Sequence, residues 1–312
     1  MPELKHLPVL LNETIEGLNI RSGGVYFDGT LGGGGHSYEI LKKSAPDGRL
    51  IATDLDDYAI MRATDKLKEF DGRFTILKDN FKNFKRIKEE RNIEGFDGIL
   101  LDLGVSSFQI DDKSRGFSYL AESEKLDMRM SADNPLTAEY IVNNYSEKEL
   151  TRILTEYGEE KFSSKIAKGI VDARKIKPVS TVGELNKIIS EAIPKKFQRD
   201  GHPSKRTYQA LRIEVNGELD GLYETIKDMV SGLKRKGRIA IITFHSLEDR
   251  IVKNVFKELE TDCICDKSLP VCICGKKKEI EIITKHPIVA GERELTENGR
   301  AKSAKLRIAE KV

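Results

Sequence analysis

The sequence lacks a dominant charge and a long apolar run, and each absence excludes a class of protein. Its 312 residues include 53 basic and 51 acidic side chains, which leave a net charge of only +2. Overall charge therefore does not indicate a nucleic-acid partner, and such a role would need local basic clusters. No apolar run approaches the roughly 20 residues that span a bilayer. The start, MPELKHLPVL, also lacks the pattern of a secretory signal. We expect a cytoplasmic protein without a membrane partner.

Cysteine is scarce, and all four cysteines lie within CICDKSLPVCIC, residues 263–274. Two Cys-x-Cys pairs can hold one tetrahedral metal ion through four thiolates. Their spacing is tighter than the usual Cys-x-x-Cys pattern, so a reduced hairpin without metal is the other interpretation. Disulfides are not expected in a cytosolic chain. We predict no metal site, and leave open a zinc ion bound by these residues: Cys263, Cys265, Cys272 and Cys274.

What the sequence does contain is an alternation of strands and helices, interrupted once. Short apolar runs typical of buried parallel strands occur at 25–28, 50–54, 74–77, 99–102 and 238–244. A helix is expected over 210–222, and two alternating segments at 279–288 and 303–311 are expected to pair at the sheet edge. Between residues 113 and 205 the strand signal disappears, and capping boxes open helices at Ser146 and Thr181. We predict an α/β domain (1–112 and 206–312) with an inserted all-helical domain (113–205).

The first strand runs into four consecutive glycines, Gly32 to Gly35, within VYFDGTLGGGGHS. Glycines at a strand-to-helix turn let backbone N–H groups approach a nucleotide-like ligand. The second strand ends on Asp54, where a carboxylate is placed to accept hydrogen bonds from ribose hydroxyls. This layout is typical of a nucleoside-cofactor site. It does not choose between a dinucleotide and S-adenosylmethionine (SAM).

Polar side chains also follow the other predicted strands. Ligands of open α/β sheets bind beyond the carboxyl ends of strands, and an unpaired buried carboxylate is costly. We therefore assign Asp102 to the site, with a helix-capping acid as the alternative. After the third strand, Asp79 and Phe81 suit contacts with an adenine, although Phe81 is equally suited to the core. After the fifth strand, His245 is a proton acceptor, a donor that contacts a base, or a structural histidine. His36, after the glycines, is better suited to bond a cofactor or the loop backbone.

Basic residues concentrate in KKFQRDGHPSKR, residues 195–206, where they alternate with Phe197 and His202. Cations interleaved with rings suit phosphate contact and base stacking on folded RNA. A solvated loop is the alternative. The residues that we assign to RNA binding are Lys195, Lys196, Arg199, Lys205 and Arg206.

Several blocks together resemble the bacterial RsmH (MraW) family. They are HLPVLLNETI (6–15), YFDGTLGGGGHS (26–37), ILLDLGVSS (99–107), RGFSYLAESEKLDMRM (115–130), RTYQALRIEVNGEL (206–219) and TFHSLEDRIVK (243–253). The resemblance implies a Rossmann-like, class I SAM-dependent methyltransferase. Its substrate would be the N4 amino group of a cytosine in the decoding (P-site) region of small-subunit (16S) rRNA. The implied partner is this rRNA or the assembled small subunit, and a homodimer is left open.

The resemblance also implies roles for single residues. Gly34, Gly35 and His36 would hold the methionine part of SAM, Asp54 the ribose, and Phe81 would lie beside the adenine. Asp102 and Gln109 would complete the pocket near the sulfonium. As catalytic groups we name Asp102, to hold the N4 hydrogens and receive the proton, and His245.

Three other functions compete with this interpretation. The glycine turn and Asp54 would also serve a nicotinamide-dependent dehydrogenase. A non-catalytic RNA-binding assembly factor would keep the fold without the activity. The third is an enzyme that methylates another amino group, such as adenine N6, and only the family resemblance favours cytosine over it. Methylation of cytosine carbon-5 needs a cysteine nucleophile, and no predicted strand exit carries one.

Overall fold

A computed structural model describes residues 8–198, 201–266 and 273–312. The described residues divide into two compact units. The first unit comprises the chain up to Gly104 together with Leu219–Val312, and the second unit is Val105–Glu218. The second unit is therefore longer at both ends than the predicted insertion of 113–205. Its extension includes α10 (Lys205–Asn216), which contributes Tyr208, Leu211 and Val215 to the core of the second unit.

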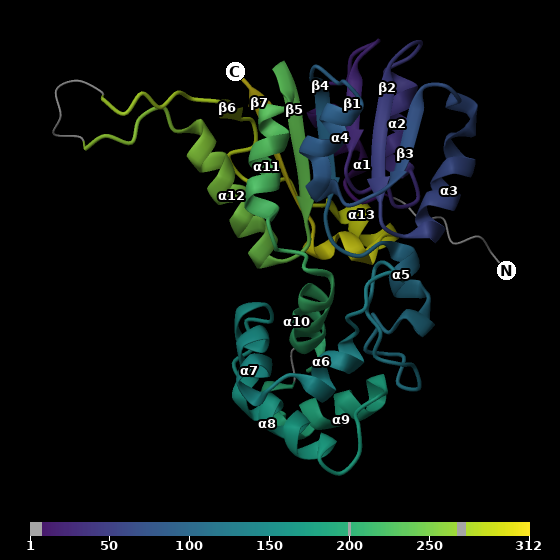
Figure 1. Cartoon of the computed structure of the whole chain (residues 1–312), viewed down its shortest axis with the longest axis vertical. Helices are drawn as coiled ribbons and strands as arrows, with labels where there is room; N and C mark the ends of the chain where they lie inside the picture. The colour runs from purple at the N-terminus through teal and green to yellow at the C-terminus, as the bar shows by residue number, and fades with distance from the viewer. Residues whose placement is uncertain (1–7, 199–200, 267–272) are drawn as a thin grey trace. The chain divides into compact units, whose positions relative to one another are not determined.

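The first unit is built on a seven-stranded sheet in the order β3-β2-β1-β4-β5-β7-β6 (Figure 1). Neighbouring strands from β3 to β5 are parallel, whereas β7 is antiparallel to both β5 and β6. The strands are β1 (Val25–Asp28), β2 (Arg49–Asp54), β3 (Phe74–Lys78), β4 (Phe96–Asp102), β5 (Leu233–Thr243), β6 (Ile280–Ile282) and β7 (Lys305–Lys311). The expected α/β, Rossmann-like fold is confirmed, and so is the pairing of the last two strands at the edge.

Helices cover both faces of this sheet, because alternate strand residues feed two separate apolar cores. One core joins Phe27, Ile99 and Ile241 of the strands to helices α4, α11 and α12. The other joins Leu50 and Ala240 to helices α1, α2 and α3. The helices of the first unit are α1 (Leu11–Gly17), α2 (Gly35–Lys43), α3 (Asp57–Leu67), α4 (Phe84–Glu90), α11 (Leu222–Ser231), α12 (Ser246–Glu260) and α13 (Glu292–Glu297), with 3-10 turns η1 (Lys68–Phe70), η2 (Phe81–Asn83) and η5 (Gly299–Ser303).

The helix expected over 210–222 is two helices. Helix α10 ends at Asn216 because Gly217 adopts a left-handed conformation with φ of 55°. A second left-handed residue, Gly221 at φ 66°, then precedes α11. Glycine adopts such angles without the steric cost of a Cβ atom, so the two glycines form a break between the helices.

The second unit is helical around a single apolar core. Both predicted capping boxes are present: Ser146 and Glu149 exchange side-chain and backbone hydrogen bonds at the start of α7, and Thr181 and Glu184 do so at α9. Its helices are α5 (Ser107–Asp111), α6 (Ala138–Asn144), α7 (Glu147–Glu156), α8 (Ser163–Arg174), α9 (Val182–Ala192) and α10, with 3-10 turns η3 (Lys113–Arg115) and η4 (Lys195–Phe197). Among the described residues of the chain, no helix is both long and apolar enough to cross a membrane.

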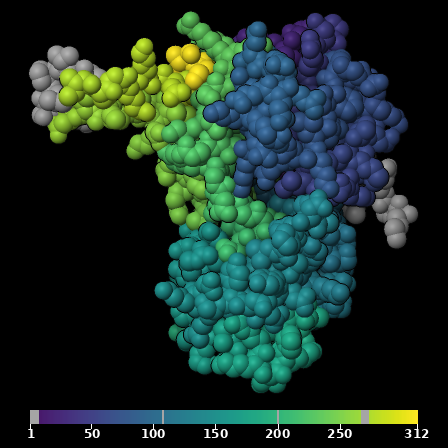
Figure 2. All heavy atoms as spheres, viewed as in Figure 1, coloured from purple at the N-terminus to yellow at the C-terminus, as the bar shows by residue number. Residues whose placement is uncertain are grey.

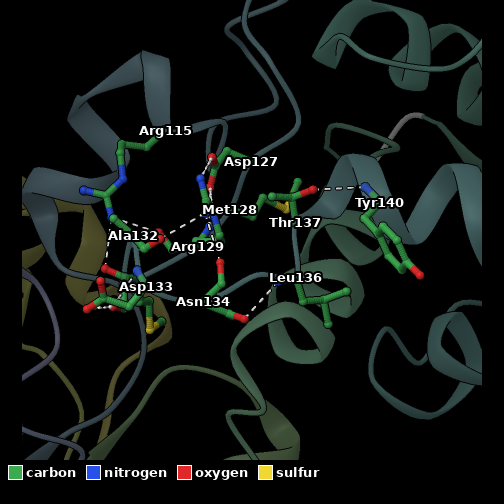
Figure 3. Close-up of polar contacts among 12 residues, drawn as sticks. Arg115, Asp127, Met128, Arg129, Ala132, Asp133, Asn134, Leu136, Thr137 and Tyr140 are labelled. Carbon is green, nitrogen blue, oxygen red and sulfur yellow. Dashed lines mark hydrogen bonds and ion pairs between the residues drawn. The ribbon is translucent and has the colours of Figure 1, made fainter.

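An arginine network organises the irregular segment before α6 (Figure 3). Arg129 donates two hydrogen bonds to Asp127, at 2.9 and 2.8 Å, and two more to the carbonyls of Ala132 and Asn134. Arg115 donates to the carbonyl of Arg129 at 2.8 Å. Burial would raise the pKa of Asp127, but the hydrogen bonds and charge of Arg129 keep it below its ordinary value. These contacts give hydrogen-bond donors to backbone carbonyls in a stretch that has no regular secondary structure.

Candidate active site

The glycine turn between β1 and α2 has a backbone that other residues would not fit. Gly32 and Gly34 have φ angles of 49° and 73°. A Cβ atom on Gly34 would lie 3.1 Å from the Cβ of Ala63, and one on Gly35 would lie 2.2 Å from the Cγ of Pro8. At Gly32 the nearest atom to an added Cβ is 4.0 Å away, so that side of the turn is open. The turn is therefore closely packed at Gly34 and Gly35 and open at Gly32, which leaves room for a ligand beside Gly32.

The first turn of α2 presents backbone donors next to this open side. Gly34 is the N-cap of the helix and makes no side-chain cap. The N–H groups of Gly35, His36 and Ser37 donate to no acceptor among the described residues. Unpaired N–H groups and the helix dipole together favour an anionic group at such a position. The methionine part of SAM carries a carboxylate, so the donors fit that part of the cofactor.

Asp54 is joined to the glycine turn by hydrogen bonds. Its Oδ2 accepts from the backbone N–H of Gly32 at 2.8 Å, and its Oδ1 accepts from that of Asp56 at 2.9 Å. Desolvation raises the pKa of Asp54, and these hydrogen bonds oppose the rise. A carboxylate oxygen accepts more than one hydrogen bond, so both oxygens retain capacity for ribose hydroxyls.

Asp102 lies at the carboxyl end of β4 with one oxygen buried and unpartnered. Its backbone N–H donates to Thr30 Oγ1 at 2.5 Å, which anchors it beside the β1 exit. Its Oδ1 is buried and makes no hydrogen bond among the described residues. Burial raises the pKa of Asp102 to about 8, and the nearby charges of Asp28 and Glu248 add to the effect. A buried carboxyl group with an unused oxygen fits a ligand that brings a hydrogen-bond donor.

Asp28, at the end of β1, is a second buried acid of the site that sequence reasoning missed. It accepts from the Ser37 hydroxyl at 2.6 Å and from the Thr30 N–H at 3.1 Å. Burial raises its pKa to about 6 despite these hydrogen bonds. The available signal was its position, because Asp28 directly precedes Gly29 in the same block as the glycine turn.

His36 is buried and contacts Asp102 without forming an ion pair. Its Nε2 lies 3.1 Å from the carbonyl oxygen of Val9, so Nε2 carries the hydrogen and Nδ1 is the bare nitrogen. Nδ1 is 3.9 Å from Asp102 Oδ2, which is beyond hydrogen-bond distance. Burial lowers the pKa of His36 to about 4, while that of Asp102 is raised. Near neutral pH the contact therefore joins an uncharged imidazole to a largely protonated carboxyl group.

Asp79 and Phe81, at the exit of β3, differ in how they are held. Asp79 Oδ1 accepts from Asn80 N–H and the Asn83 side chain at 2.8 and 2.7 Å, and its Oδ2 pairs with Arg86. These contacts hold Asp79 to its own turn and to Arg86 of α4. Phe81 is partly exposed and packs against the edge of the core that lies under α4. It therefore has an accessible part beside which an adenine would fit.

His245 is the N-cap of α12. Its Nδ1 accepts from the N–H of Glu248 at 3.4 Å, and its Nε2 is 3.2 Å from Glu248 Oε1. Glu248 Oε2 in turn accepts from the N–H groups of Phe244 and His245. The ring is buried, and Nε2 makes no hydrogen bond among the described residues although Glu248 Oε1 lies 3.2 Å away. This geometry favours the structural alternative for His245, and its catalytic role stays a prediction.

The remaining predicted residues lie in the second unit. Gln109 is buried and completes a capping box with Ser106 at the start of α5. The Lys196 ammonium is 5.0 Å from the ring centroid of Phe197, whose side chain is 56% exposed. Lys195, Lys205 and Arg206 are also exposed. The structure thus shows an accessible basic and aromatic surface on η4 and at the start of α10. Arg199 lies outside the described residues.

Comparison with known proteins identifies the family. A family model described as the MraW methylase family matches residues 3–312. The chain is 56% identical over 310 residues to ribosomal RNA small subunit methyltransferase H 2 of Agathobacter rectalis, covering 99% of each chain. It is 54% identical over 310 residues to ribosomal RNA small subunit methyltransferase H of Clostridium botulinum (strain 657 / Type Ba4), covering 99% of this chain and 100% of that one.

Among solved structures, an rRNA methylase from Streptococcus thermophilus covers 97% of this chain and 93% of its own, with 10% identity and a TM-score of 0.41. We infer nothing from so weak a likeness. The family match spans almost the whole sequence, and the relatives are more than half identical. The chain therefore belongs to the MraW methylase family, whose reaction draws its methyl group from S-adenosylmethionine.

Proposed function

We propose that this protein transfers a methyl group from SAM to the N4 amino group of a cytosine in small-subunit (16S) rRNA, in the decoding (P-site) region. The relatives are named for methylation of small-subunit ribosomal RNA, which supports this class of substrate. The choice of cytosine, of its N4 atom and of the decoding region rests on the family resemblance. The observation that supports an amino-group target is Asp102, whose buried Oδ1 has no hydrogen-bond partner among the described residues.

The residues around the glycine turn fit SAM as follows. The unpaired N–H groups of Gly35 and His36, with Gly34 as N-cap, would hold the carboxylate of the methionine part. Asp54 would accept from the ribose hydroxyls, and Phe81 would pack beside the adenine. When bound, SAM supplies an electrophilic methyl carbon attached to a cationic sulfur. Gln109 is kept as a further proposed contact on the family resemblance alone.

The task of Asp102 in this proposal is to make the target nitrogen a better nucleophile. The lone pair of a cytosine amino group is delocalised into the ring, so the nitrogen must pyramidalise as it attacks. Asp102 Oδ1 would accept a hydrogen bond from one N–H, which favours that geometry, and then take the proton. Its raised pKa suits proton acceptance close to neutral pH, provided that the carboxyl group is ionised when the target arrives. A cation bound nearby would lower the pKa of Asp102 and so favour the ionised form.

The contacts of the two histidines suit them to position neighbouring groups, and the catalytic role of His245 stays a prediction. His36 is held by the Val9 carbonyl and remains neutral, so it places the first turn of α2 without adding a charge beside Asp102. His245 and Glu248 fix the turn after β5 through reciprocal hydrogen bonds. Because Glu248 contributes to the raised pKa of Asp102, this cap also influences the acid.

The RNA contact is proposed to involve the basic surface of the second unit. Exposed Lys195, Lys196, Lys205 and Arg206 would contact phosphates, and Phe197 offers a ring on which an unpaired base can stack. The target base must leave any helix to reach the methyl group, so it should be unpaired or flipped out. Arg199 is included in this proposal on its sequence position alone.

A methyl-transfer assay tests the proposal. Small ribosomal subunits, and naked 16S rRNA, from a strain lacking this protein are incubated with the purified chain and methyl-labelled SAM. One part of the RNA is cleaved into oligonucleotides, whose masses locate the label, and another part is digested to nucleosides, which are separated by chromatography and identified by mass spectrometry. Label in N4-methylcytidine from one decoding-region position is the expected result. Label in 5-methylcytidine or N6-methyladenosine, or no label in either substrate, would refute the assignment.

A further inference from the structure

The segment between α12 and β6 has no apolar core of its own among its described residues. Hydrogen bonds close its base, where the N–H of Glu279 donates to the carbonyl of Leu259 at 2.8 Å. Beyond that point the side chains of Ile264 and Ile273 are 70% and 78% exposed. Figure 2 shows the described residues on either side of 267–272 extending away from the rest of the first unit. A projection this small, with its apolar side chains in solvent, needs another source of order.

Three cysteines of this projection bring their sulfur atoms together. The Sγ atoms of Cys263, Cys265 and Cys274 all lie within 4.8 Å of one another. The Sγ atoms of Cys263 and Cys274 are 3.9 Å apart, far beyond a disulfide bond of about 2.05 Å. Tetrahedral zinc with Zn–S bonds of about 2.3 Å places its sulfurs about 3.8 Å apart. The 3.9 Å spacing matches that of two ligands of one ion, and it also matches an S–H···S hydrogen bond between the protonated thiols.

The backbone around these cysteines also suits thiolates. The N–H of Cys265 is 3.4 Å from Cys263 Sγ, that of Ile273 is 3.3 Å from Cys265 Sγ, and that of Ile264 is 3.5 Å from Cys274 Sγ. Each sulfur thus accepts from one amide. Hydrogen bonds to the charged form of a group favour that form, and metal-bound thiolates are commonly supported in this way. Gly275, at φ 63°, then turns the chain directly after the last of the three cysteines.

We propose that Cys263, Cys265 and Cys274 supply three of the ligands of a structural Zn²⁺ ion. Soft thiolates select zinc over hard cations such as magnesium and calcium. Each thiol releases its proton on binding, so affinity increases with pH. Lys276, Lys277 and Lys278 follow in sequence and offset the negative charge of a zinc–thiolate centre. Cys272, the fourth cysteine, lies outside the described residues and is not part of the proposal.

Metal analysis of the whole protein tests this proposal. The chain, without a histidine tag, is produced in zinc-supplemented medium, purified and dialysed, and its zinc is measured by mass spectrometry of the elements. We expect about one zinc per chain. Cys263→Ser and Cys274→Ser should each reduce retained zinc at least tenfold after dialysis against a weak chelator. Ile264→Ser, which alters an exposed side chain between two of the cysteines, is the matched control and should keep the metal.

Circular dichroism confirms that each variant is folded, so that metal loss is not a consequence of unfolding. Substitution with Co²⁺ gives a second readout, because thiolate ligation produces intense sulfur-to-cobalt charge-transfer absorption. Its presence in the parent chain and its loss in the cysteine variants supports the site. Retention of less than about a tenth of a zinc per chain, equal zinc in parent and cysteine variants, or a disulfide between Cys263 and Cys274 in protein isolated under alkylating conditions would overturn it.

Discussion

Substitution of Asp102 by Asn should stabilise the protein while removing its activity. In the folded chain the pKa of Asp102 is raised from 3.8 to about 8. An acid with a raised pKa favours the folded state below its unfolded pKa, and this contribution is lost as pH rises through the folded pKa. Each pH unit between the two values changes the free energy of unfolding by about 1.4 kcal/mol. Asn carries no charge at any of these pH values, so the free energy of unfolding of the variant does not fall in this way.

The expected signature is a difference that depends on pH. At pH 5 both side chains are neutral in the folded state, but Asp102 is already largely ionised in the unfolded chain, so roughly 1 to 2 kcal/mol of the difference between the parent and Asp102→Asn is present. Between pH 5 and pH 8 the free energy of unfolding of the variant should rise by on the order of 4 kcal/mol relative to that of the parent. Urea unfolding followed by far-ultraviolet circular dichroism at both pH values measures this. Asp65→Asn, which makes the same change at an exposed position of α3, is the control and should show no such gain.

The same variant tests the chemistry. Loss of a proton-accepting group typically costs 10²- to 10⁴-fold in rate, so methyl transfer should fall by roughly that factor while SAM still binds. Equilibrium dialysis with labelled SAM and the methylation assay give the two numbers. A stability difference of equal size at pH 5 and pH 8 would show that Asp102 is ionised in the folded chain. Near-normal methylation would show that it is not the acceptor.

Three further outcomes are expected. Gly34→Ala should weaken SAM binding at least tenfold because its Cβ would press on Ala63. The control is Gly72→Ala, at a residue with a similar φ of 77° and open space around it. This control should lose about 1 kcal/mol of stability and keep its affinity for SAM. Nuclear magnetic resonance should find the His36 ring neutral down to about pH 4. The free energy of unfolding should fall as pH drops from 6.5 toward 4, because the unfolded histidine takes up a proton first. Titration of His36 near 6.5 would contradict the burial argument. Charge reversal of four basic residues should make the salt slope of binding to a 16S rRNA transcript shallower by up to about 3, measured by filter binding. The reversed residues are Lys195, Lys196, Lys205 and Arg206, with exposed Lys148 and Lys187 reversed as the control, and an unchanged slope in the first set would remove this surface from the interface.

Much of the fold could be predicted because local signals and the final structure agree. The strand at Val25–Asp28 was predicted with its observed bounds, since an apolar run ends there at an acid and a glycine. The capping boxes at Ser146 and Thr181 were likewise confirmed, because a cap is a contact between residues close in sequence. Predicted strands at the other positions agree with β2, β3, β4 and β5 apart from their ends.

What the sequence did not reveal depended mostly on how separate elements meet in the folded chain. The second unit extends past the C-terminal end of the predicted insertion because the apolar stripe of α10 does not reveal which of two cores it joins. The influence of Glu248 on Asp102 arises only when separate strand exits meet, whereas Asp28 and Ser37 lie nine residues apart and meet because the glycine turn folds α2 back onto the end of β1. For His245, the sequence suggested a strand-exit base, but the same position is also an N-cap, and only coordinates distinguish the two.

The position of the second unit within the chain has a consequence for how the sheet assembles. Strands β4 and β5 pair along Gly98–Asp102, yet residues 103–232 separate them in sequence. Closing a flexible loop of about 130 residues costs roughly 4 kcal/mol in chain entropy before any strand contact forms. If the helical insertion folds first, most of that loop is already compact, and the entropy cost of bringing β4 and β5 together is smaller. Substitutions in the core of the insertion should therefore delay the assembly of a sheet to which they contribute no residue.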